Sequence, residues 1–211
     1  MPVRFVKICG ITRLADAQAA ITAGTNALGF VFWPRSPRFI EPDLAKQIVS
    51  ALPPAVRAIG VFVDQPAEQV NEIADRVGLT DVQLHGAESL EYVHRMNRHV
   101  VKAVAVAGDV PPVLGKWPED VTILLDVHDP VRKGGTGRTI DWVAASGIAG
   151  QRQVILAGGL NPENVTEAIT QVRPWGIDVS SGVESAPGIK DHGRLRALFE
   201  AVHGSHYATR S

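Results

Sequence analysis

The pattern of the whole chain is set by its first apolar run, Val6-Lys7-Ile8-Cys9-Gly10-Ile11-Thr12, in which a short strand ends and a loop leads into a helical segment. Further apolar runs of strand length follow along the chain. Most of them are continuous rather than alternating, which is typical of strands covered on both faces of a parallel sheet. The expected strands are residues 5–8, 27–32, 58–63, 82–84, 100–106, 121–125, 154–156 and 177–179.

The segments between these runs have helical periodicity and helix-end signals. Apolar residues repeat at helical spacing at Leu195, Leu198, Phe199 and Val202, and again at Leu44, Ile48, Val49 and Leu52. The expected helix boundaries are Pro42, Pro66 and Asn161-Pro162 at the starts, and Gly24 and Gly78 at the ends.

Eight strand-loop-helix units predict a (β/α)8 TIM barrel of the α/β class, forming a single compact domain over residues 1–211. We expect residues 204–211 to form a disordered tail. An open doubly wound sheet is the alternative, but such a sheet more often carries a glycine fingerprint after its first strand, and Cys9-Gly10-Ile11-Thr12 is not one.

Composition narrows the classes of function. The net charge of −1 provides no basic face for nucleic acid and no polybasic strip for an acidic membrane. No apolar run approaches the ~20 residues of a membrane span. A single cysteine cannot form an internal disulfide, and the first residues do not resemble a signal peptide, so we expect a cytoplasmic protein.

The chemistry of a barrel gathers where its strands end. The chemically capable residues at those positions are Cys9, Arg38, Asp64, His85, Asp126, Gly158, Gly159 and the segment Asp178-Val179-Ser180-Ser181-Gly182. Small residues after the last two strands let backbone amides approach an anion, which predicts phosphate binding by Gly158, Gly159, Ser180, Ser181 and Gly182. The structural alternative is that these glycines only form tight turns.

Another glycine cluster, Gly134-Gly135-Thr136-Gly137, follows the sixth strand. It lacks the lysine of a P-loop, so we do not expect it to bind a nucleoside triphosphate. It is either a mobile substrate loop or a surface turn.

Each candidate also has a structural interpretation. Cys9 could be a small apolar residue of the strand, and Asp126 could cap the following loop. Arg38 could be a surface charge, and His85 could be structural or could line the substrate.

Six motifs together resemble the phosphoribosylanthranilate isomerase family, from Lys7 to about Asp191. They are Lys7-Ile8-Cys9-Gly10-Ile11-Thr12, Gly29-Phe30-Val31-Phe32 followed by Ser36-Pro37-Arg38, Val82-Gln83-Leu84-His85-Gly86, Leu124-Leu125-Asp126, Gly158-Gly159-Leu160-Asn161-Pro162-Glu163-Asn164-Val165 and Asp178-Val179-Ser180-Ser181-Gly182-Val183-Glu184. Their order and spacing over almost the whole chain make the resemblance specific.

The resemblance implies a small (β/α)8 barrel that catalyses a step of tryptophan biosynthesis without a cofactor or a metal. That step is the Amadori rearrangement of N-(5-phosphoribosyl)anthranilate. By motif, Cys9 would be the general base, Asp126 the general acid and Arg38 the partner of the anthranilate carboxylate. We also expect His85 and Asp178 to contact the phosphorylated substrate. The oligomeric state, monomer or homodimer, stays open.

Three other functions are compatible with a phosphate-binding barrel. A metal-dependent epimerase needs a histidine and carboxylate cluster, whereas His85 is the only histidine at an expected strand end. An isomerase that also accepts the aminoaldose of histidine biosynthesis usually has a carboxylate in place of Cys9. A non-catalytic sugar-phosphate sensor needs the phosphate loops but not Cys9 and Asp126 together.

Overall fold

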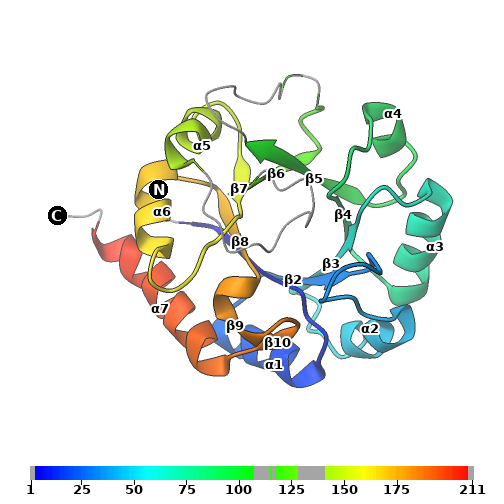
Figure 1. Cartoon of the computed structure of the whole chain (residues 1–211), viewed down its shortest axis with the longest axis horizontal. Coiled ribbons are helices and arrows are strands. Elements are labelled where there is room, and N and C mark those ends of the chain that lie inside the picture. The colour runs from blue at the N-terminus through cyan, green and yellow to red at the C-terminus, as the bar shows by residue number, and fades with distance from the viewer. Residues whose placement is uncertain (1–2, 107–114, 116, 128–140, 209–211) are drawn as a thin grey trace.

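Eight parallel strands close into a barrel in sequential order in the computed structural model, which describes residues 3–106, 115, 117–127 and 141–208 (Figure 1). The strands are β1 (Phe5–Cys9), β2 (Ala27–Val31), β3 (Arg57–Phe62), β4 (Asp81–Leu84), β5 (His99–Val106), β6 (Thr122–Val127), β7 (Val154–Leu156) and β8 (Gly176–Val179). The first and last strands pair, with Lys7 beside Asp178. The predicted barrel is confirmed.

The helices cover the outside of the barrel (Figure 1). They are α1 (Leu14–Ala23), α2 (Pro42–Val49), α3 (Ala67–Val77), α4 (Leu90–Val93), α5 (Trp142–Ala149), α6 (Val165–Val172) and α7 (His192–Ala208). Between β8 and α7 lie the short 3-10 helix η2 (Ser181–Val183) and a hairpin of β9 (Glu184–Ala186) and β10 (Ile189–Lys190).

The structure corrects three local predictions. Of the expected disordered tail, residues 204–208 continue α7, and residues 209–211 lie outside the described residues. α6 begins at Val165 rather than directly after Asn161, although the Asn161 side chain accepts hydrogen bonds from the backbone N–H groups of Glu163 and Asn164, as a residue that caps a first turn does. Leu44 is 45% exposed, because the inward face of α2 carries Ala45 and Ile48 instead.

Other helix signals are confirmed. Gly24 (φ 106°) and Gly78 (φ 81°) end α1 and α3 in the left-handed conformation that glycine adopts without steric cost. The apolar residues of α7 from Leu195 to Val202 are buried against the barrel. No helix in the described ranges has the length and apolar character needed to cross a membrane.

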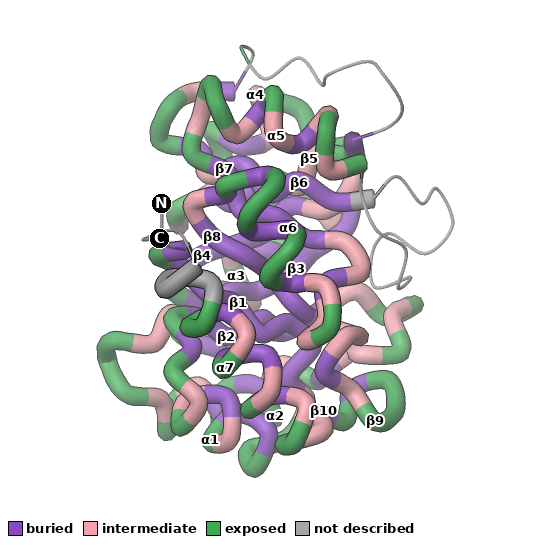
Figure 2. The backbone as a smooth tube through the Cα atoms, turned by 90° about the vertical axis from the view of Figure 1, so that its left-hand side faces the viewer, coloured by how far each residue is buried: buried purple, intermediate pink, exposed green. Residues whose placement is uncertain are grey.

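The core has an outer and an inner part, because a barrel strand points alternate side chains outward and inward. The outer part fills the space between strands and helices, and burial is concentrated in the strands (Figure 2). The inner part has an apolar cluster that includes Phe5, Ala27, Ile59, Val101, Leu124 and Ile155. Phe5 also stacks on Trp175, with ring centroids 5.0 Å apart, before β8 begins. Packing of the amino-terminal half therefore leaves the carboxyl ends of the strands for chemistry.

Candidate functional site

A cavity of about 480 Å³ opens at the carboxyl ends of the strands. It brings together the predicted site residues Cys9, Arg38, His85, Asp126, Gly158, Gly159, Asp178, Ser180 and Ser181. Gly182 and Asp64 do not line it. The glycine cluster at residues 134–137 lies outside the described residues.

Cys9 ends β1 inside the barrel, where it is buried beside Gly29 of β2. A Cβ atom on Gly29 would lie 2.7 Å from the Cys9 Sγ, so the glycine provides the space that the thiol occupies. Burial raises the pKa of the Cys9 thiol, and the nearby Lys7 ammonium acts in the opposite direction.

Lys7 and Asp178 form a buried ion pair below the cavity. The Lys7 side chain is fully buried, and its Nζ lies 2.9 Å from the Asp178 Oδ2. Asp178 also lines the cavity, so this carboxylate lies between a buried cation and the space for a substrate.

Asp126 at the end of β6 has a histidine partner from β4. The His85 Nε2 lies 3.1 Å from the Asp126 Oδ2, and the His85 Nδ1 lies 3.0 Å from the Gln83 Nε2. Because an amide nitrogen only donates, this arrangement assigns the proton of a neutral His85 to Nε2, where it faces Asp126. His85 can therefore orient the carboxyl group by donating a hydrogen bond to it.

Arg38 follows β2 and reaches a carboxylate from the hairpin after β8. Its Nε lies 2.9 Å from the Glu184 Oε1, and its Nη2 lies 2.6 Å from the Glu184 Oε2. The two-pronged face of the guanidinium is thus occupied by Glu184. The Nη1 N–H groups and the second N–H of Nη2 remain able to meet a substrate carboxylate.

Glu184 is held in its charged form by two cations. Burial opposes ionisation, but hydrogen bonds from Arg38 and Lys190 outweigh it and hold the pKa of Glu184 below its usual range. The Lys190 Nζ lies 2.7 Å from the Glu184 Oε1 and donates to the Cys9 carbonyl at 2.6 Å. Lys190 therefore links the end of β1 to the group that holds Arg38.

The loop after β7 begins with two glycines whose backbone is accessible. Gly158 (φ 87°) and Gly159 (φ 67°) both have positive φ values, which glycine adopts without steric cost, and neither carries a side chain that would keep an anion away from the backbone amides. The Asn164 Nδ2 donates to the Gly159 carbonyl at 3.0 Å and fixes the loop.

The loop after β8 packs directly on the loop after β7. A Cβ atom on Gly182 would lie 1.9 Å from the Leu160 carbonyl oxygen, so only glycine allows the two loops to meet. Gly182 thus supports the cavity from outside rather than lining it. In the cavity wall, the Ser180 Oγ is buried and has no hydrogen-bond partner among the described residues.

Asp64 holds the loop that follows His85. It takes the left-handed conformation (φ 53°), and its Oδ1 accepts a hydrogen bond from the Ala87 N–H at 2.6 Å. Below it, Glu88 accepts from the Gly86 N–H and pairs with the buried Lys102 at 2.8 Å.

The sequence analysis missed Lys7, Gln83, Glu184 and Lys190. A signal existed for the first two, because each is a polar residue inside an apolar strand and lies two positions before a site residue on the same strand face. No local signal marked Glu184 or Lys190, which lie in a hairpin that the eight-unit pattern does not require.

The chain resembles one family of known proteins over nearly its full length. The family model described as N-(5'phosphoribosyl)anthranilate (PRA) isomerase matches residues 6–201. The N-(5'-phosphoribosyl)anthranilate isomerase of Geobacter sp. (strain M21) is 48% identical over 193 residues, which cover 90% of this chain and 94% of the relative.

Solved structures agree with the sequence match. Phosphoribosyl anthranilate isomerase from Thermotoga maritima superposes with a TM-score of 0.88 at 42% identity, covering 97% of this chain and 100% of the other. The Thermus thermophilus structure gives 0.87 at 42% identity, with coverages of 95% and 98%. A further isomerase structure, in complex with reduced 1-(o-carboxyphenylamino)-1-deoxyribulose 5-phosphate, gives 0.85 at 40% identity, with coverages of 97% and 100%.

Proposed function

The chain belongs to the N-(5'-phosphoribosyl)anthranilate isomerase family, and from that premise we propose that Cys9 and Asp126 divide the proton transfers of its reaction. The protein is an isomerase of tryptophan biosynthesis. It converts N-(5'-phosphoribosyl)anthranilate into 1-(2-carboxyphenylamino)-1-deoxyribulose 5-phosphate by an Amadori rearrangement. The roles of individual residues in that conversion are our proposal.

Asp126 opens the sugar ring. A carboxylic acid gives a proton to the ring oxygen while the C1–O bond breaks and the nitrogen lone pair forms an iminium ion. The His85 Nε2, 3.1 Å from the Asp126 Oδ2, orients the carboxyl group by a hydrogen bond. Asp126 therefore acts as the general acid.

Cys9 takes the second proton. The iminium ion acidifies the hydrogen on C2, and a thiolate at Cys9 removes it to give an enolamine, which tautomerises to the ketone. Burial beside Gly29 and Lys7 keeps the thiol in one place at the wall of the cavity. No atom is gained or lost in the sequence, as an isomerisation requires.

Two charged ends of the substrate fix its orientation. We assign the phosphate to the backbone amides of Gly158 and Gly159 and to the loop Ser180-Ser181-Gly182. We assign the anthranilate carboxylate to Arg38, which Glu184 holds in position. Asp178 completes the wall near the reacting carbons.

One observation carries this assignment: Cys9, Asp126 and the phosphate loops line a single cavity. A sugar-phosphate sensor would use the loops alone. The test is to add purified protein to freshly made N-(5'-phosphoribosyl)anthranilate and follow the loss of substrate fluorescence. Loss that depends on protein concentration supports the isomerase, and binding without loss supports the sensor.

Two further assays separate the remaining alternatives. We expect activity to survive dialysis against a strong chelator, because acid-base chemistry at Cys9 and Asp126 needs no Lewis acid. Activity that disappears and returns with added zinc or iron would support an epimerase-like mechanism. Turnover of the aminoaldose of histidine biosynthesis would indicate the broader isomerase.

We also propose that the enzyme works in the cytoplasm on a small phosphorylated substrate, without nucleic acid or membrane partners. The single cysteine and the near-neutral charge support this assignment. Association between copies stays open, because a Thermotoga maritima relative is described as dimeric and also has engineered monomeric forms. Sedimentation at several protein concentrations would settle it.

A further inference from the structure

A fully buried lysine lies two residues before the proposed base. Lys7 and Cys9 share strand β1, so their side chains point to the same face of the strand, toward the barrel interior. Lys7 has no exposed surface and forms an ion pair with Asp178 at 2.9 Å. Taking an ammonium ion out of water costs several kcal/mol, and an apolar residue would fill the same space at lower cost. Such a charge beside a reactive group suggests a function.

The backbone of β2 brings the ammonium and the thiol together. A Cβ atom on Gly29 would lie 2.7 Å from the Cys9 Sγ and 3.0 Å from the Lys7 Nζ. Both atoms thus border the same small space, which only glycine leaves open. The sulfur has a cation beside it on the side away from bulk water.

Asp178 competes for the same cation. Its Oδ2 accepts the Lys7 hydrogen bond, and its buried Oδ1 has no hydrogen-bond partner among the described residues. A carboxylate near a thiol opposes formation of the thiolate, whereas an ammonium favours it. The two members of one ion pair therefore act on Cys9 with opposite signs.

We propose that Lys7 is the positioning residue that favours formation of the thiolate base at Cys9 and that Asp178 moderates this effect by sharing the ammonium. The proposal deepens the function above and rests on the base role assigned there to Cys9. It assigns to Lys7 a part in the reaction without contact with the substrate. It also gives Asp178 a role besides contact with the substrate.

The electrostatics of the cluster support these signs. Burial is the largest influence and leaves the pKa of Cys9 above its ordinary value, while Lys7 acts to lower that pKa and Asp178 acts to raise it. Burial also acts to lower the pKa of Lys7, but Asp178 and Cys9 outweigh this and raise it, so the lysine stays charged. Lys190 also acts to lower the pKa of Cys9; its ammonium contacts the Cys9 carbonyl and pairs with Glu184, and the charged side chains of Arg38 and Asp126 line the same cavity.

The test is a titration of the only thiol in the chain, which needs no substrate. The ultraviolet absorbance of the thiolate is recorded against pH as a difference from a Cys9→Ala variant, so that tyrosine signals cancel. The rate of alkylation by iodoacetamide, measured against pH, gives a second value for the pH midpoint of thiol ionisation. The variants are Asp178→Asn and the double variant Lys7→Met with Asp178→Asn, which leaves no unpaired buried charge and so is expected to fold.

We expect the two variants to shift the thiol midpoint in opposite directions. Asp178→Asn lowers it, because the ammonium then acts on Cys9 alone. The double variant raises it, because burial is no longer offset by Lys7, and alkylation at neutral pH slows about three- to tenfold. The alkaline rise of kcat/KM should move with the midpoint, since only a base role for the thiolate ties activity to its titration.

The matched control is the double variant Lys102→Met with Glu88→Gln, which likewise leaves no unpaired buried charge. Lys102 is also a buried lysine in an ion pair, with Glu88 at 2.8 Å, but it lies on β5. Its loss should leave the Cys9 midpoint unchanged. A midpoint that is unchanged in the double variant, or that shifts the same way in both test variants, overturns the proposal. Failure of the proposed function is distinct, since it appears as normal turnover by Cys9→Ala.

Discussion

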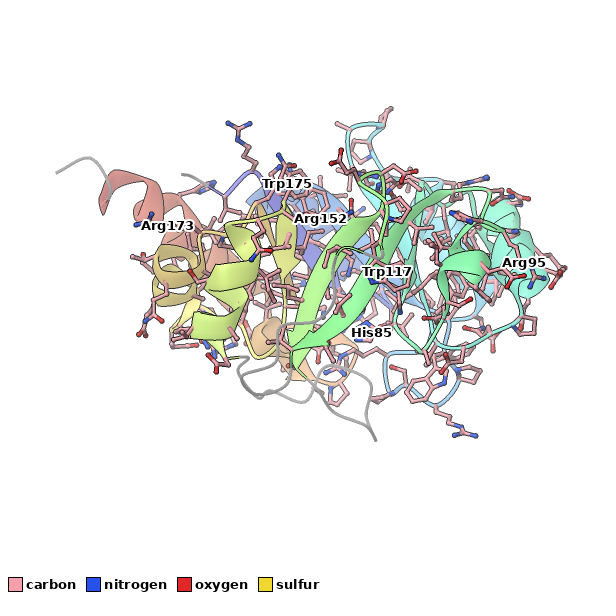
Figure 3. The ribbon with its side chains drawn as sticks, turned by 90° about the horizontal axis from the view of Figure 1, so that it is seen from above. His85, Arg95, Trp117, Arg152, Arg173 and Trp175 are labelled. Atoms are coloured by element: carbon pink, nitrogen blue, oxygen red, sulfur yellow. The ribbon has the colours of Figure 1, made fainter. Side chains whose placement is uncertain are left out.

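The two ends of the barrel use buried polar groups differently. At the amino-terminal end, the first residues of three neighbouring strands, Arg57, Asp81 and His99, form a cluster in which both Asp81 oxygens are bonded. At the carboxyl end, buried polar atoms are left without partners among the described residues. Figure 3 shows the two ends, with Trp175 toward one and His85 toward the other.

In the amino-terminal cluster, which we call closed, both oxygens of the buried carboxylate have hydrogen-bond partners. Asp81 is fully buried and accepts from the Arg57 Nε at 2.8 Å, from the Thr80 Oγ1 at 2.6 Å and from His99, whose Nδ1 lies 2.7 Å away. The other ring nitrogen of His99 lies 3.2 Å from the Thr122 Oγ1 on β6. These contacts join the starts of β3 to β6, so this end contributes stability.

At the carboxyl end, by contrast, several buried polar atoms have no hydrogen-bond partner among the described residues. Asp178 Oδ1, Ser180 Oγ and Gln83 Oε1 are buried in residues that line the cavity, and none has a partner within the described ranges. Unpaired buried polar groups cost stability, typically about 1–3 kcal/mol each. The difference between the ends shows that the barrel gives up hydrogen bonds where a substrate can supply them.

The largest expected effect is at the carboxyl end. Cys9→Ala and Asp126→Asn should each lower kcat by about 10²–10⁴-fold, the contribution typical of a positioned acid or base. Steady-state kinetics measure the loss of kcat, and thermal unfolding measures any change in stability. The melting temperature should change little. The catalytic assignment is falsified if Cys9→Ala retains near-normal turnover, and His85 or Asp178 must then take the proton.

At the amino-terminal end we expect a substitution to lower stability and to leave activity unchanged. Asp81→Asn should lower the free energy of unfolding by about 1.5–3 kcal/mol, because hydrogen bonds to a buried charged group are lost. Denaturant unfolding measures the change. We expect kcat and KM to stay within about twofold of wild type. A large loss of kcat in folded protein would show that the two ends are coupled.

A smaller effect tests the contact between the phosphate loops. Gly182→Ala places a Cβ atom against the Leu160 carbonyl, so the loops must move apart and the affinity for phosphate should fall about tenfold. Competitive inhibition by inorganic phosphate measures this change. The control is Gly147→Ala in α5, whose added Cβ would meet no atom within 4 Å. Equal inhibition of both variants and wild type would contradict the phosphate assignment.

The smallest expected effect is on the stability of the protein at low pH. Burial opposes ionisation of Asp81, but hydrogen bonds from His99, Arg57 and Thr80 hold its pKa below its usual range. A lowered folded pKa contributes stability above the unfolded value, about 3.9, and that stability is lost as pH falls through the folded pKa. The stability gap between wild type and Asp81→Asn should therefore shrink below about pH 4. A gap independent of pH would show that the charge of Asp81 is not what stabilises this end.

Most of the fold could be predicted because its signals are local. Each strand is a short apolar run, and Gly24 and Gly78 end their helices by a backbone preference of their own. The predictions failed where a competing local contact decided the outcome. The capping turn at Asn161 runs for several residues before α6 begins at Val165, and the inward face of α2 begins at Ala45 rather than Leu44.

The sequence by itself determined the barrel, the places of Cys9 and Asp126 near the carboxyl ends of their strands, and the glycines of the loop after β7, because strand periodicity and backbone preference act over a few residues. Only the tertiary structure decided which charges meet. Lys7 pairs with Asp178 across 171 positions, and Arg38 with Glu184 across 146. Closure of the sheet places β8 beside β1, and no local pattern among many charged residues specifies which two will then be adjacent.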